Sequence, residues 1–425
     1  MLLESIVSEQ FAGLPQFDET QDAEGYVESF TQAWRELGRQ CLEQQLQQRI
    51  EQVERERQGA KSKRSRRYQS PLGTLSLRRR IYGKECAADV ALRLPSDGWF
   101  RSVQELSSAL GVSSEFGNAN RLLHRWSGIS MSEKTLANHV EAYGEALFEL
   151  ATEPDETSES AGCPIRSSVS VAAAPAPNRP VFYVGADGIH TPMRQGGTCE
   201  AKVGVMFWDA DHLRVSKQRA VVKAREYVAT LENVEGFRAQ LNRCYQQTVD
   251  HKPHQVVFLG DGAAWLWRMA HLLFPDAIQI LDFFHVSEYL WDVARGAFWA
   301  DTEAQKAWVN EQQTALKHSQ WPSVVKAAQR LPPVSDDLTN SIERLVSYLT
   351  NNQSRIDYKR YLDRGLMIGS GIVESSNRRI ITMRLKQSGM FWSKRGAEAV
   401  MTLRAAYLSG SQRWHNFWDK SSAHR

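Results

Sequence analysis

The chain has 425 residues, which is too long for one ordinary hydrophobic core and predicts two to four domains. Its net charge of +3, from 52 basic and 49 acidic residues, is too small to indicate nucleic-acid binding by itself. The five cysteines are far apart without a CxxC pair, which argues against a disulfide framework and a zinc ribbon. An acidic N-terminus and the lack of an apolar run of about 20 residues predict a soluble, cytoplasmic protein without a membrane partner.

The N-terminal region combines a helix with a basic segment. Residues 22–58 contain no proline, and their apolar line predicts one long amphipathic helix, which either packs on its own region or binds a partner. The alternation in TLSLRRRIY predicts a strand. Ahead of it, KSKRSRR is typical of a solvated face or flexible arm, but its charge density also suits contact with phosphates. The basic residues of this run are Lys61, Lys63, Arg64, Arg66 and Arg67.

Two further helical patterns lie within residues 101–151, separated by a short turn at Gly128. Ser130 to Glu133 matches a capping box at the start of the second helix. The pattern predicts a helix-turn-helix, with an ordinary αα-hairpin as the alternative. In the first case the second helix lies in the major groove of DNA and exposes Glu133, Lys134, Asn138 and His139. The expected core residues are Leu122, Leu123, Trp126, Ile129, Leu136 and Val140.

A Ser-, Ala- and Pro-rich stretch, residues 152–179, has no periodicity and predicts a linker. Strands and helices then alternate. We expect strands at RPVFYVGAD, AKVGVMFW and LRVSKQRAVV, a helix at YVATLENVEGFRAQLNRCYQQ, and then a strand, a helix and a strand at HQVVFLGD, GAAWLWRMAHLLF and AIQILDFFHV. Two successive β-α-β crossovers predict an α/β layer with a partly parallel sheet. Residues 286–366 show no strand pattern, so we expect an all-helical insertion.

Three acids occupy comparable places. VGADG and LGDGA put Asp187 and Asp261 at the carboxyl ends of predicted strands, where open α/β sheets bind ligands, and the glycine after each permits a sharp turn. Glu374 begins a predicted helix in GSGIVESSNRR. Each acid alone is more simply a turn former or helix cap. Three converging carboxylates would repel one another unless cations such as Mg²⁺ or Mn²⁺ neutralised them. A pair of such ions can activate a nucleophile in phosphodiester chemistry.

Five stretches resemble DDE transposases of bacterial insertion sequences, most nearly the ISKra type, which is related to Mutator-like transposases. They are VFYVGADGIHTP, FLGDGAAWLW, DFFHVSEYL, YLDRGLMIGSGIVESSNRR and LKQSGMFWSKRGAEAVMTLRAAYLS, in the family's order over residues 181–418. The resemblance implies an RNase H-like catalytic domain in which Asp187, Asp261 and Glu374 hold two Mg²⁺ or Mn²⁺ ions. DFFH is similar to a D-x-x-H motif of that superfamily, which implies an auxiliary site at Asp282 and His285.

The expected fold is therefore α/β: an RNase H-like catalytic domain with an all-helical insertion, preceded by a helical and small-β DNA-binding region. The expected parts are residues 1–100 (helix, basic arm and small β region), 101–151 (helix-turn-helix), 152–179 (linker), 180–285 (first part of the catalytic core), 286–366 (insertion) and 367–425 (second part of the core and C-terminal helices).

The resemblance implies a transposase that binds terminal inverted repeats, cuts double-stranded DNA and joins the freed end to target DNA. It also implies a homodimer or larger synaptic complex on the nucleoid. Asn377 and Arg378 follow Glu374 by about one helical turn and are expected to contact the DNA strand, unless Arg378 pairs with Glu374. Lys394 and Arg395, near Trp392, suit backbone contacts and base stacking. The alternatives are a non-catalytic or domesticated DNA-binding regulator and an RNase H-like nuclease without strand transfer.

Overall fold

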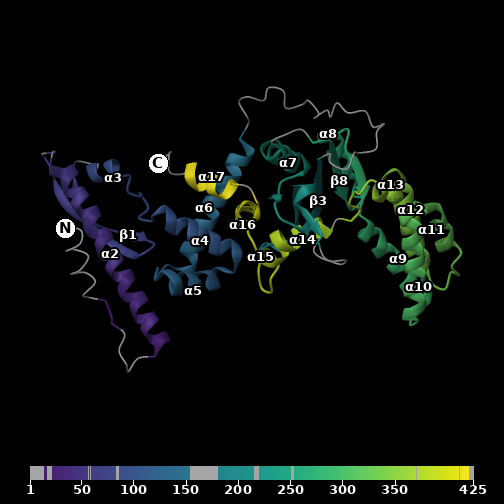
Figure 1. Ribbon diagram of the computed structural model, residues 1–425, viewed down its shortest axis with the longest axis horizontal. Helices are drawn as coiled ribbons and strands as arrows, with labels where there is room; N and C mark the ends of the chain where they lie inside the picture. The colour runs from purple at the N-terminus through teal and green to yellow at the C-terminus, as the bar shows by residue number, and fades with distance from the viewer. Residues whose placement is uncertain are drawn as a thin grey trace. The chain divides into compact units, whose positions relative to one another are not determined.

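Figure 1 shows the computed structural model, which describes residues 14–16, 22–55, 57, 59–82, 86–153, 180–214, 220–249, 253–369, 371–410 and 412–420. The chain divides into two compact units, Met1–Tyr143 with His415–Arg425 (unit 1) and Gly144–Trp414 (unit 2). Beyond residue 153, the linker predicted at residues 152–179 lies outside the described residues. Among the described helices, none has both the length and the apolar character needed to cross a bilayer.

Unit 1 begins with the predicted long helix, α2 (Ala23–Arg55), and an antiparallel hairpin of β1 (Ser62–Ser70) and β2 (Gly73–Ile81). The basic run, for which the sequence predicts an arm or a solvated face, is strand β1. One face of the hairpin packs against α2 and α3 (Ala87–Ala91), because Tyr68 of β1 and the alternate apolar residues of β2 point to that face. The core here contains Ile50, Tyr68, Leu75, Leu77, Cys86, Ala88 and Leu94, with Leu42 and Leu46 beside it.

Polar side chains of α2 cap the outer edge of β2. Carboxylate or amide oxygens of the helix accept hydrogen bonds from alternate N–H groups of the strand. The pairs are Glu43 with Ser76 (3.0 Å), Gln47 with Arg78 (2.9 Å) and Glu54 with Arg80. Four helical residues rise about 6 Å and two strand residues about 6.6 Å, so Glu43 and Gln47 meet successive outward N–H groups from successive turns of α2, whereas Glu54 reaches the next N–H group from two turns further along. The edge of β2 is therefore closed to other strands.

Three helices follow in unit 1: α4 (Arg101–Ser113), α5 (Phe116–Ser127) and α6 (Glu133–Thr152), whose last two turns belong to unit 2. α5 ends at Gly128, which has a φ of +69°. The N-cap of α6 is Ser132, not Ser130, since Ser132 Oγ accepts the Thr135 N–H at 3.0 Å. α4 and α6 approach closely at Gly111, where a Cβ atom would lie 2.6 Å from Val140 Cγ2.

Two expectations for this helical region are wrong. Trp126 is 70% exposed, because the buried stripe of α5 runs through Ala119, Leu123 and Ser127 at four-residue spacing and leaves Trp126 off it. His139 is half-buried rather than presented to a partner. Its ring lies edge-on to Trp99 with centroids 5.0 Å apart, and burial lowers its pKa. Leu123, Ile129, Leu136 and Val140 are buried as predicted.

Unit 2 contains a mixed five-stranded sheet of order β7-β4-β3-β8-β9, which confirms the α/β class. Its strands are β3 (Val181–Pro192), β4 (Thr198–Trp208), β7 (Glu226–Thr230), β8 (Gln255–Gly260) and β9 (Ile278–Leu281). β4 is antiparallel to β3 and β7, whereas β3, β8 and β9 are parallel. The helices α7 (Val234–Thr248) and α8 (Ala264–Leu273) make the two crossovers.

Helices cover both faces of this sheet (Figure 1). Gly204 faces α7, where a Cβ atom would lie 2.7 Å from Leu241 Cδ1. Gly185 faces the opposite side, since it is adjacent to Ala186, the register partner of Gly204. There it meets α14 (Gly371–Asn377), and a Cβ atom would lie 2.4 Å from a methyl group of Val373. These contacts need glycine, because a larger residue would push the helices away from the strands.

The predicted third strand and the following helix differ from the structure. LRVSKQRAVV forms only a short separate pair, β5 (His212–Arg214) and β6 (Ala220–Val222), with residues 215–219 outside the described part. The sheet strand is instead β7, within a stretch expected to be helical. Its EYVAT sequence carries aromatic and β-branched residues that favour a strand. Helix α7 begins only after Asn233, whose side chain accepts the Gly236 N–H at 2.9 Å.

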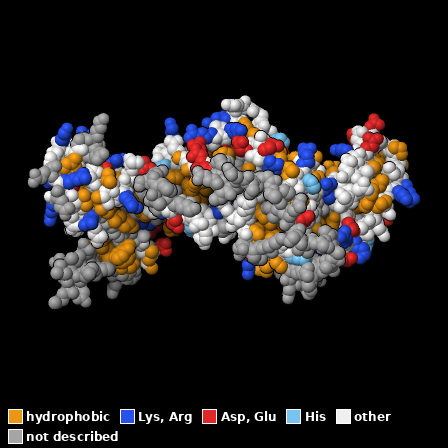
Figure 2. Space-filling view, turned by 90° about the horizontal axis from the view of Figure 1, so that it is seen from above, with side chains coloured by type: hydrophobic (Ala, Val, Ile, Leu, Met, Phe, Trp, Pro, Cys, Tyr) orange, Lys and Arg blue, Asp and Glu red, His pale blue; other side chains and the backbone are white. Residues whose placement is uncertain are grey.

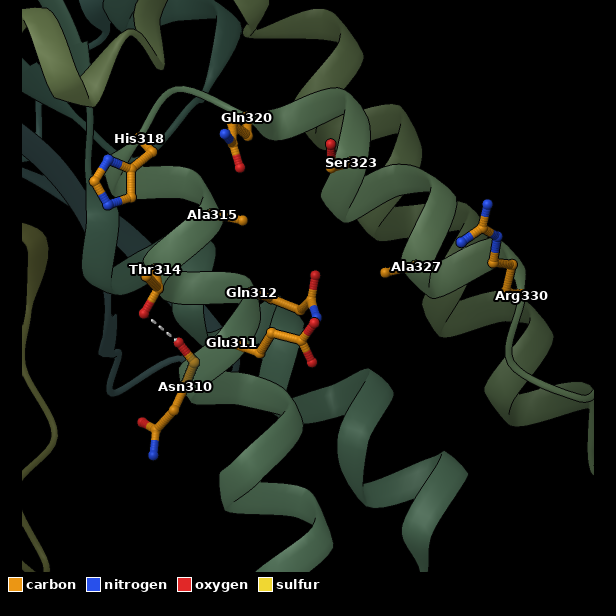
Figure 3. A pocket seen from close by; sticks show the side chains of 10 residues that line it. All are labelled: Asn310, Glu311, Gln312, Thr314, Ala315, His318, Gln320, Ser323, Ala327 and Arg330. Atoms are coloured by element: carbon orange, nitrogen blue, oxygen red, sulfur yellow. Dashed lines mark hydrogen bonds between the residues drawn. The ribbon is translucent and has the colours of Figure 1, made fainter.

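Residues 283–363 are helical and contain no strand. The elements are α9 (Phe283–Phe298), α10 (Thr302–Lys317), α11 (Trp321–Gln329), α12 (Asp336–Asn351), the 3₁₀ turn η2 (Gln353–Arg355) and α13 (Tyr358–Asp363). α10 and α11 line a polar groove of about 590 Å³, whose lining includes Glu311, His318 and Arg330 (Figure 3). The lining contains none of the aspartates of the five-stranded sheet.

Candidate functional site

Three aspartates lie level with one another in or directly after the three parallel strands, at the rim where the pairing between these strands ends. The β3–β8 register ends with Gly185 opposite Leu259, so two further residues bring Asp187 level with Asp261. The β8–β9 register likewise brings Asp282 level with Asp261. Carboxyl ends of neighbouring parallel strands are where open α/β sheets place their ligands. The predicted strand-end acids Asp187 and Asp261 thus share one edge with Asp282, the acid of the DFFH motif.

Asp187 does not end its strand, although the sequence predicts that it does. β3 continues to Pro192 in pairing with β4, and only the pairing with β8 stops before Asp187. Gly188 therefore makes no turn. Its lack of a side chain instead makes room for Glu200, whose Oε1 would lie 2.4 Å from a Cβ atom at this position. Asp187 faces the same side of the sheet as Gly185, which is the side that α14 covers.

Burial, and then the charge of Asp261, raise the pKa of Asp187 to about 6. Two hydrogen bonds act in the opposite direction: the Gly188 N–H donates to Oδ1 at 2.7 Å, and Asn377 Nδ2 donates to Oδ2. The charge of His285 also lowers the pKa. Asp187 is therefore a half-buried carboxyl group, and among the described residues no basic side chain offsets its burial and the nearby charge of Asp261.

Asp261 is held by its own turn and by a tyrosine. Its Oδ1 accepts the Ala263 N–H at 2.9 Å, and its backbone carbonyl accepts the hydroxyl of Tyr348 from α12. Gly262 has a φ of +104°, as the predicted sharp turn requires, and a Cβ atom there would lie 2.6 Å from the Tyr348 ring. The helical region thus contributes directly to the position of Asp261.

Asp282 and His285 lie at the start of α9, because β9 ends at Leu281 rather than running through DFFHV. Asp282 is buried and N-caps α9, since its Oδ1 accepts the Phe284 N–H at 2.9 Å. His285 Nδ1 lies 3.0 Å from Glu288 Oε2. Asp282 thus has a structural role as a cap, whereas His285 is close enough to act on the charge of Asp187.

A small aromatic cluster borders this rim. The rings of Tyr289 and Tyr348 stack with centroids 4.4 Å apart, and His285 lies edge-on to both, at 5.6 and 5.9 Å. Burial, followed by the charge of Asp261, raises the pKa of Tyr348. The Tyr348 hydroxyl therefore stays protonated and remains a donor to the carbonyl of Asp261.

Helix α14 brings Asn377, rather than Glu374, to Asp187. Val373 packs on Gly185 and Asn377 is buried against Asp187, whereas Glu374 is exposed. Among the described residues, no ion pair joins Arg378 to Glu374, which was the alternative for this face. The helix continues into a π-helical turn, η3 (Arg378–Thr382), and α15 (Met383–Leu385). π-turns within helices are rare in proteins, and those that occur are often found at functional sites.

The atoms that Asp187, Asp261 and Asn377 offer as possible metal ligands at the rim are all oxygens. Asp187 and Asp261 offer carboxylates whose repulsion a cation would relieve. Asn377 Oδ1 is buried and has no hydrogen-bond partner among the described residues. Oxygen ligands of this kind suit Mg²⁺ and Mn²⁺, so these three side chains fit such an ion. In the part of the chain that the structure describes, however, no three His, Cys, Asp or Glu side chains come together as a metal site.

The basic residues expected to contact DNA in unit 2 differ in their surroundings. Arg395 makes a two-pronged ion pair with Glu145, and Lys394 Nζ lies 4.0 Å from Glu232. Arg378 is exposed at the first position of the π-turn. Trp392 is buried and donates its indole N–H to a backbone carbonyl, so it cannot stack on a base, whereas Phe391 beside it is 58% exposed.

Most of the residues of unit 1 that are expected to contact DNA are exposed, but two are engaged within the unit. Lys61, Lys63, Arg64 and Arg67 are exposed on or beside β1, but Arg66 donates to the Ser96 carbonyl and lies over the Tyr68 ring. Lys134 and Asn138 are exposed in the first two turns of α6. Figure 2 shows Lys and Arg side chains spread over unit 1. The predicted contacts of unit 1 thus remain available to a partner, except for Arg66 and the half-buried His139.

Sequence reasoning missed Tyr348 and the contact between Asn377 and Asp187. Tyr348 is 87 residues from Asp261, and Asn377 is 190 residues from Asp187. Asn377 is in the quoted GSGIVESSNRR stretch, and its three-residue spacing from Glu374 was a usable signal. Nothing in the sequence around Tyr348 distinguishes it from other tyrosines of the helical region.

The profile of the uncharacterised protein family UPF0236 matches residues 161–422, which is more than half of the 425-residue chain. The match contains the strand-end aspartates, helix α14 and the entire helical region. A comparison with curated protein sequences found no match. On the extent of the family match, the chain belongs to the uncharacterised protein family UPF0236.

Proposed function

We propose that the chain is a transposase that cuts and joins DNA strands at the rim formed by Asp187 and Asp261. The observation that carries the proposal is the pair of half-buried carboxyl groups that lie level on neighbouring parallel strands, where burial and then the charge of Asp261 raise the pKa of Asp187. Such a pair is costly for folding and is characteristic of functional sites. The sheet order, with β4 alone running against the other four strands, is compatible with an RNase H-like catalytic unit.

Asp187, Asp261 and Asn377 would hold Mg²⁺ or Mn²⁺, with Glu374 as a further ligand that the resemblance implies. Bound there, such ions would lower the pKa of a water or 3′-hydroxyl nucleophile and stabilise the leaving oxygen. Asn377 orients Asp187 through its amide N–H, and Tyr348 fixes the backbone of Asp261. Glu374 lies on the same helix three residues before Asn377, and its exposed side chain is free to turn toward the rim.

The proposed partner of unit 1 is double-stranded DNA, read by α6 through Lys134 and Asn138. The two helices α5 and α6 are joined by a short turn at Gly128, as in helix-turn-helix proteins. Cutting and joining require two DNA ends to be handled together, so we propose a dimer or larger complex on DNA. The transposon ends and the target duplex would then be the natural substrates.

Strand cleavage and joining test this function. Supercoiled plasmid carrying the DNA that flanks the gene is incubated with the full chain and Mg²⁺ or Mn²⁺, and nicked and joined products are separated. We expect Asp187→Asn, Asp261→Asn and Glu374→Gln each to lower product formation by at least about 100-fold, as loss of a catalytic electrostatic group does. Asp337→Asn, at an exposed helix position, is the matched control. Retained cleavage and joining in all three variants would refute the assignment.

A second function, DNA binding without cleavage, is favoured by one observation: Glu374 is exposed and no three acids meet among the described residues. This regulator would bind the same DNA without any divalent-ion-dependent nicking. A plain nuclease, the other enzyme alternative, would nick the plasmid but give no joined strand. The same assay therefore separates all three functions.

A further inference from the structure

The two faces of the β1–β2 hairpin differ in chemistry. The inner face is buried on α2 and α3 and includes Tyr68, Leu75 and Leu77. On the outer face every described side chain between positions 63 and 67, and between 74 and 80, is exposed and polar. These outer residues are Lys63, Ser65, Arg67, Thr74, Ser76, Arg78 and Arg80. We call this surface the outer ribbon.

The outer ribbon carries four positive charges and no acid. Lys63 is directly opposite Arg80, and Arg78 and Arg67 follow further along the hairpin as a diagonal pair, opposite Ser65 and Ser76. Like charges facing each other across a sheet destabilise it, so the arrangement costs folding free energy when no partner is bound. Among the described residues, only Arg80 has an acid nearby, with its Nε 3.7 Å from Glu54 Oε2. A polyanion would relieve this repulsion.

The inner arginines of the same hairpin show the contrast. Arg79 is buried, forms an ion pair with Asp89 and lies over the Tyr68 ring at 5.7 Å. Arg66 lies over the same ring at 5.5 Å. These two arginines serve the core of unit 1. The charge of the outer ribbon has no comparable internal use in the described structure.

The backbone of β1 adds hydrogen-bond donors along the edge of the hairpin, beside this surface. The Gln69 N–H points away from β2, since it donates to the Gly98 carbonyl at 2.7 Å. Alternate residues of an antiparallel strand share this direction, so the N–H groups of Lys63, Ser65 and Arg67 also point away from β2. Ser65 Oγ lies 2.9 Å from Ser76 Oγ, which places two hydroxyls among the charges. Backbone N–H groups, hydroxyls and Arg or Lys side chains are the groups that contact DNA phosphates.

We propose that the outer ribbon binds the phosphate backbone of double-stranded DNA independently of sequence. The proposal rests on the proposed function only in taking DNA as the polyanion. A membrane surface is a poorer partner, because the outer ribbon has no apolar side chain to enter a bilayer. The ribbon thereby supplies non-specific affinity, while the exposed residues of α6 are left to read the bases.

The test measures binding of the full chain to a labelled 30-base-pair duplex of random sequence, by fluorescence anisotropy in EDTA across a KCl series. Each phosphate contact contributes about 0.9 to the slope of log affinity against log salt. The variant Lys63→Gln, Arg67→Gln, Arg78→Gln, Arg80→Gln should lower the slope by up to about 3.6. A slope of 0.9 per contact corresponds to about an eight-fold difference in affinity between 1 M and 0.1 M KCl. Each lost contact should therefore weaken binding at 0.1 M KCl by about eight-fold, and loss of two contacts should weaken it by about 60-fold.

The matched control removes the same charge elsewhere. Arg295→Gln, Lys306→Gln, Lys326→Gln and Arg330→Gln lie at exposed positions of the helical region and should leave the slope unchanged. Circular dichroism and melting curves check that both variants fold. Should the fourfold ribbon variant unfold, Lys63→Gln with Arg67→Gln is the smaller change, with half the expected effect. Replacing the three arginines by lysine should retain the slope, because lysine also binds phosphates.

The outcomes separate this inference from the catalytic proposal, because EDTA removes divalent ions. Asp337→Asn, the exposed control, should bind the duplex like the wild type. A ribbon variant with wild-type slope and affinity overturns the inference and leaves the catalytic proposal standing. A wild-type chain that binds anionic phosphatidylserine vesicles but no duplex also overturns it. A ribbon variant that binds weakly, while Asp187→Asn, Asp261→Asn and Glu374→Gln all still cleave and join plasmid DNA, supports the ribbon and refutes the catalytic assignment.

Discussion

Asp187→Asn is expected to change how the stability of the chain depends on pH. Burial and Asp261 raise the pKa of Asp187 from the usual 3.8 to about 6, so the folded state favours the protonated carboxyl group. Between those two pH values the folded chain holds a proton that the unfolded chain has released. Stability therefore falls as pH rises from about 4 to about 6, and the loss is complete above the folded pKa.

The size of the effect follows from the pKa change. One pKa unit corresponds to about 1.4 kcal/mol, which gives an upper limit of about 3 kcal/mol. Asp187 is only half-buried and solvent screens part of the cost, so we expect about 1–2 kcal/mol. Asparagine is neutral at all pH values and escapes this loss. The asparagine side chain has one acceptor oxygen, so it can accept only one of the two hydrogen bonds that Gly188 and Asn377 donate to Asp187. This loss should lower the stability by about 1 kcal/mol at both pH values.

The assay is thermal or urea unfolding of both proteins in EDTA at pH 4.5 and pH 7.5. About a third of the loss has already occurred at pH 4.5, so the stability of Asp187→Asn relative to wild type should rise by about 1 kcal/mol between the two pH values, or about 2 °C in melting temperature. Groups elsewhere, such as His139, cancel in this comparison. Adding MgCl₂ at pH 7.5 should stabilise the wild type and not the variant. A difference between the proteins that is equal at both pH values would refute the reasoning.

Three further changes test the packing around the site and the hairpin by chemical denaturation. Gly185→Ala should cost about 1–3 kcal/mol because its methyl group collides with Val373, and Val373→Ala should restore most of the loss; no rescue would show that the strain lies elsewhere. Tyr348→Phe keeps the stacked ring but removes its hydrogen bond to Asp261, so it should cost about 1 kcal/mol, and a neutral result would mean that the bond is not formed. Glu54→Ala leaves a β2 N–H without its acceptor and should cost about 1–3 kcal/mol, with a smaller loss for Glu54→Gln; equal losses would point to packing instead.

The sequence predicts the neighbouring acids well because strand order follows from chemistry that is local in the chain. Uninterrupted apolar runs before Asp187 and Asp261, with helices between them, require buried parallel strands. The sequence does not predict that β3 continues past Asp187, since that depends on the length of its pairing with β4. It also assigned Tyr227–Thr230 to a helix, because a four-residue apolar run next to a true helix has no period of its own.

Side-chain partners were harder to predict than strands. Glu145 and Arg395 are 250 residues apart, so no local pattern shows that this arginine is already engaged. Trp126 and Trp392 are equally apolar, yet one is exposed and the other buried, because their helix and loop present them to different neighbours. The role of Asn377 depends on how closely α14 approaches β3, and that distance is set by Gly185, far away in the chain.

The closed edge of β2 limits how copies of this chain can assemble through strands. A two-stranded sheet with both edges open can add strands on either side and grow into a fibre. Here α2 covers one edge, and Gln69 at the end of β1 already pairs with residues 98–100. One short edge remains, so two hairpins could join only once, as a closed two-fold pair without a free edge for a third. Strand-mediated association through this hairpin thus stops at the dimer.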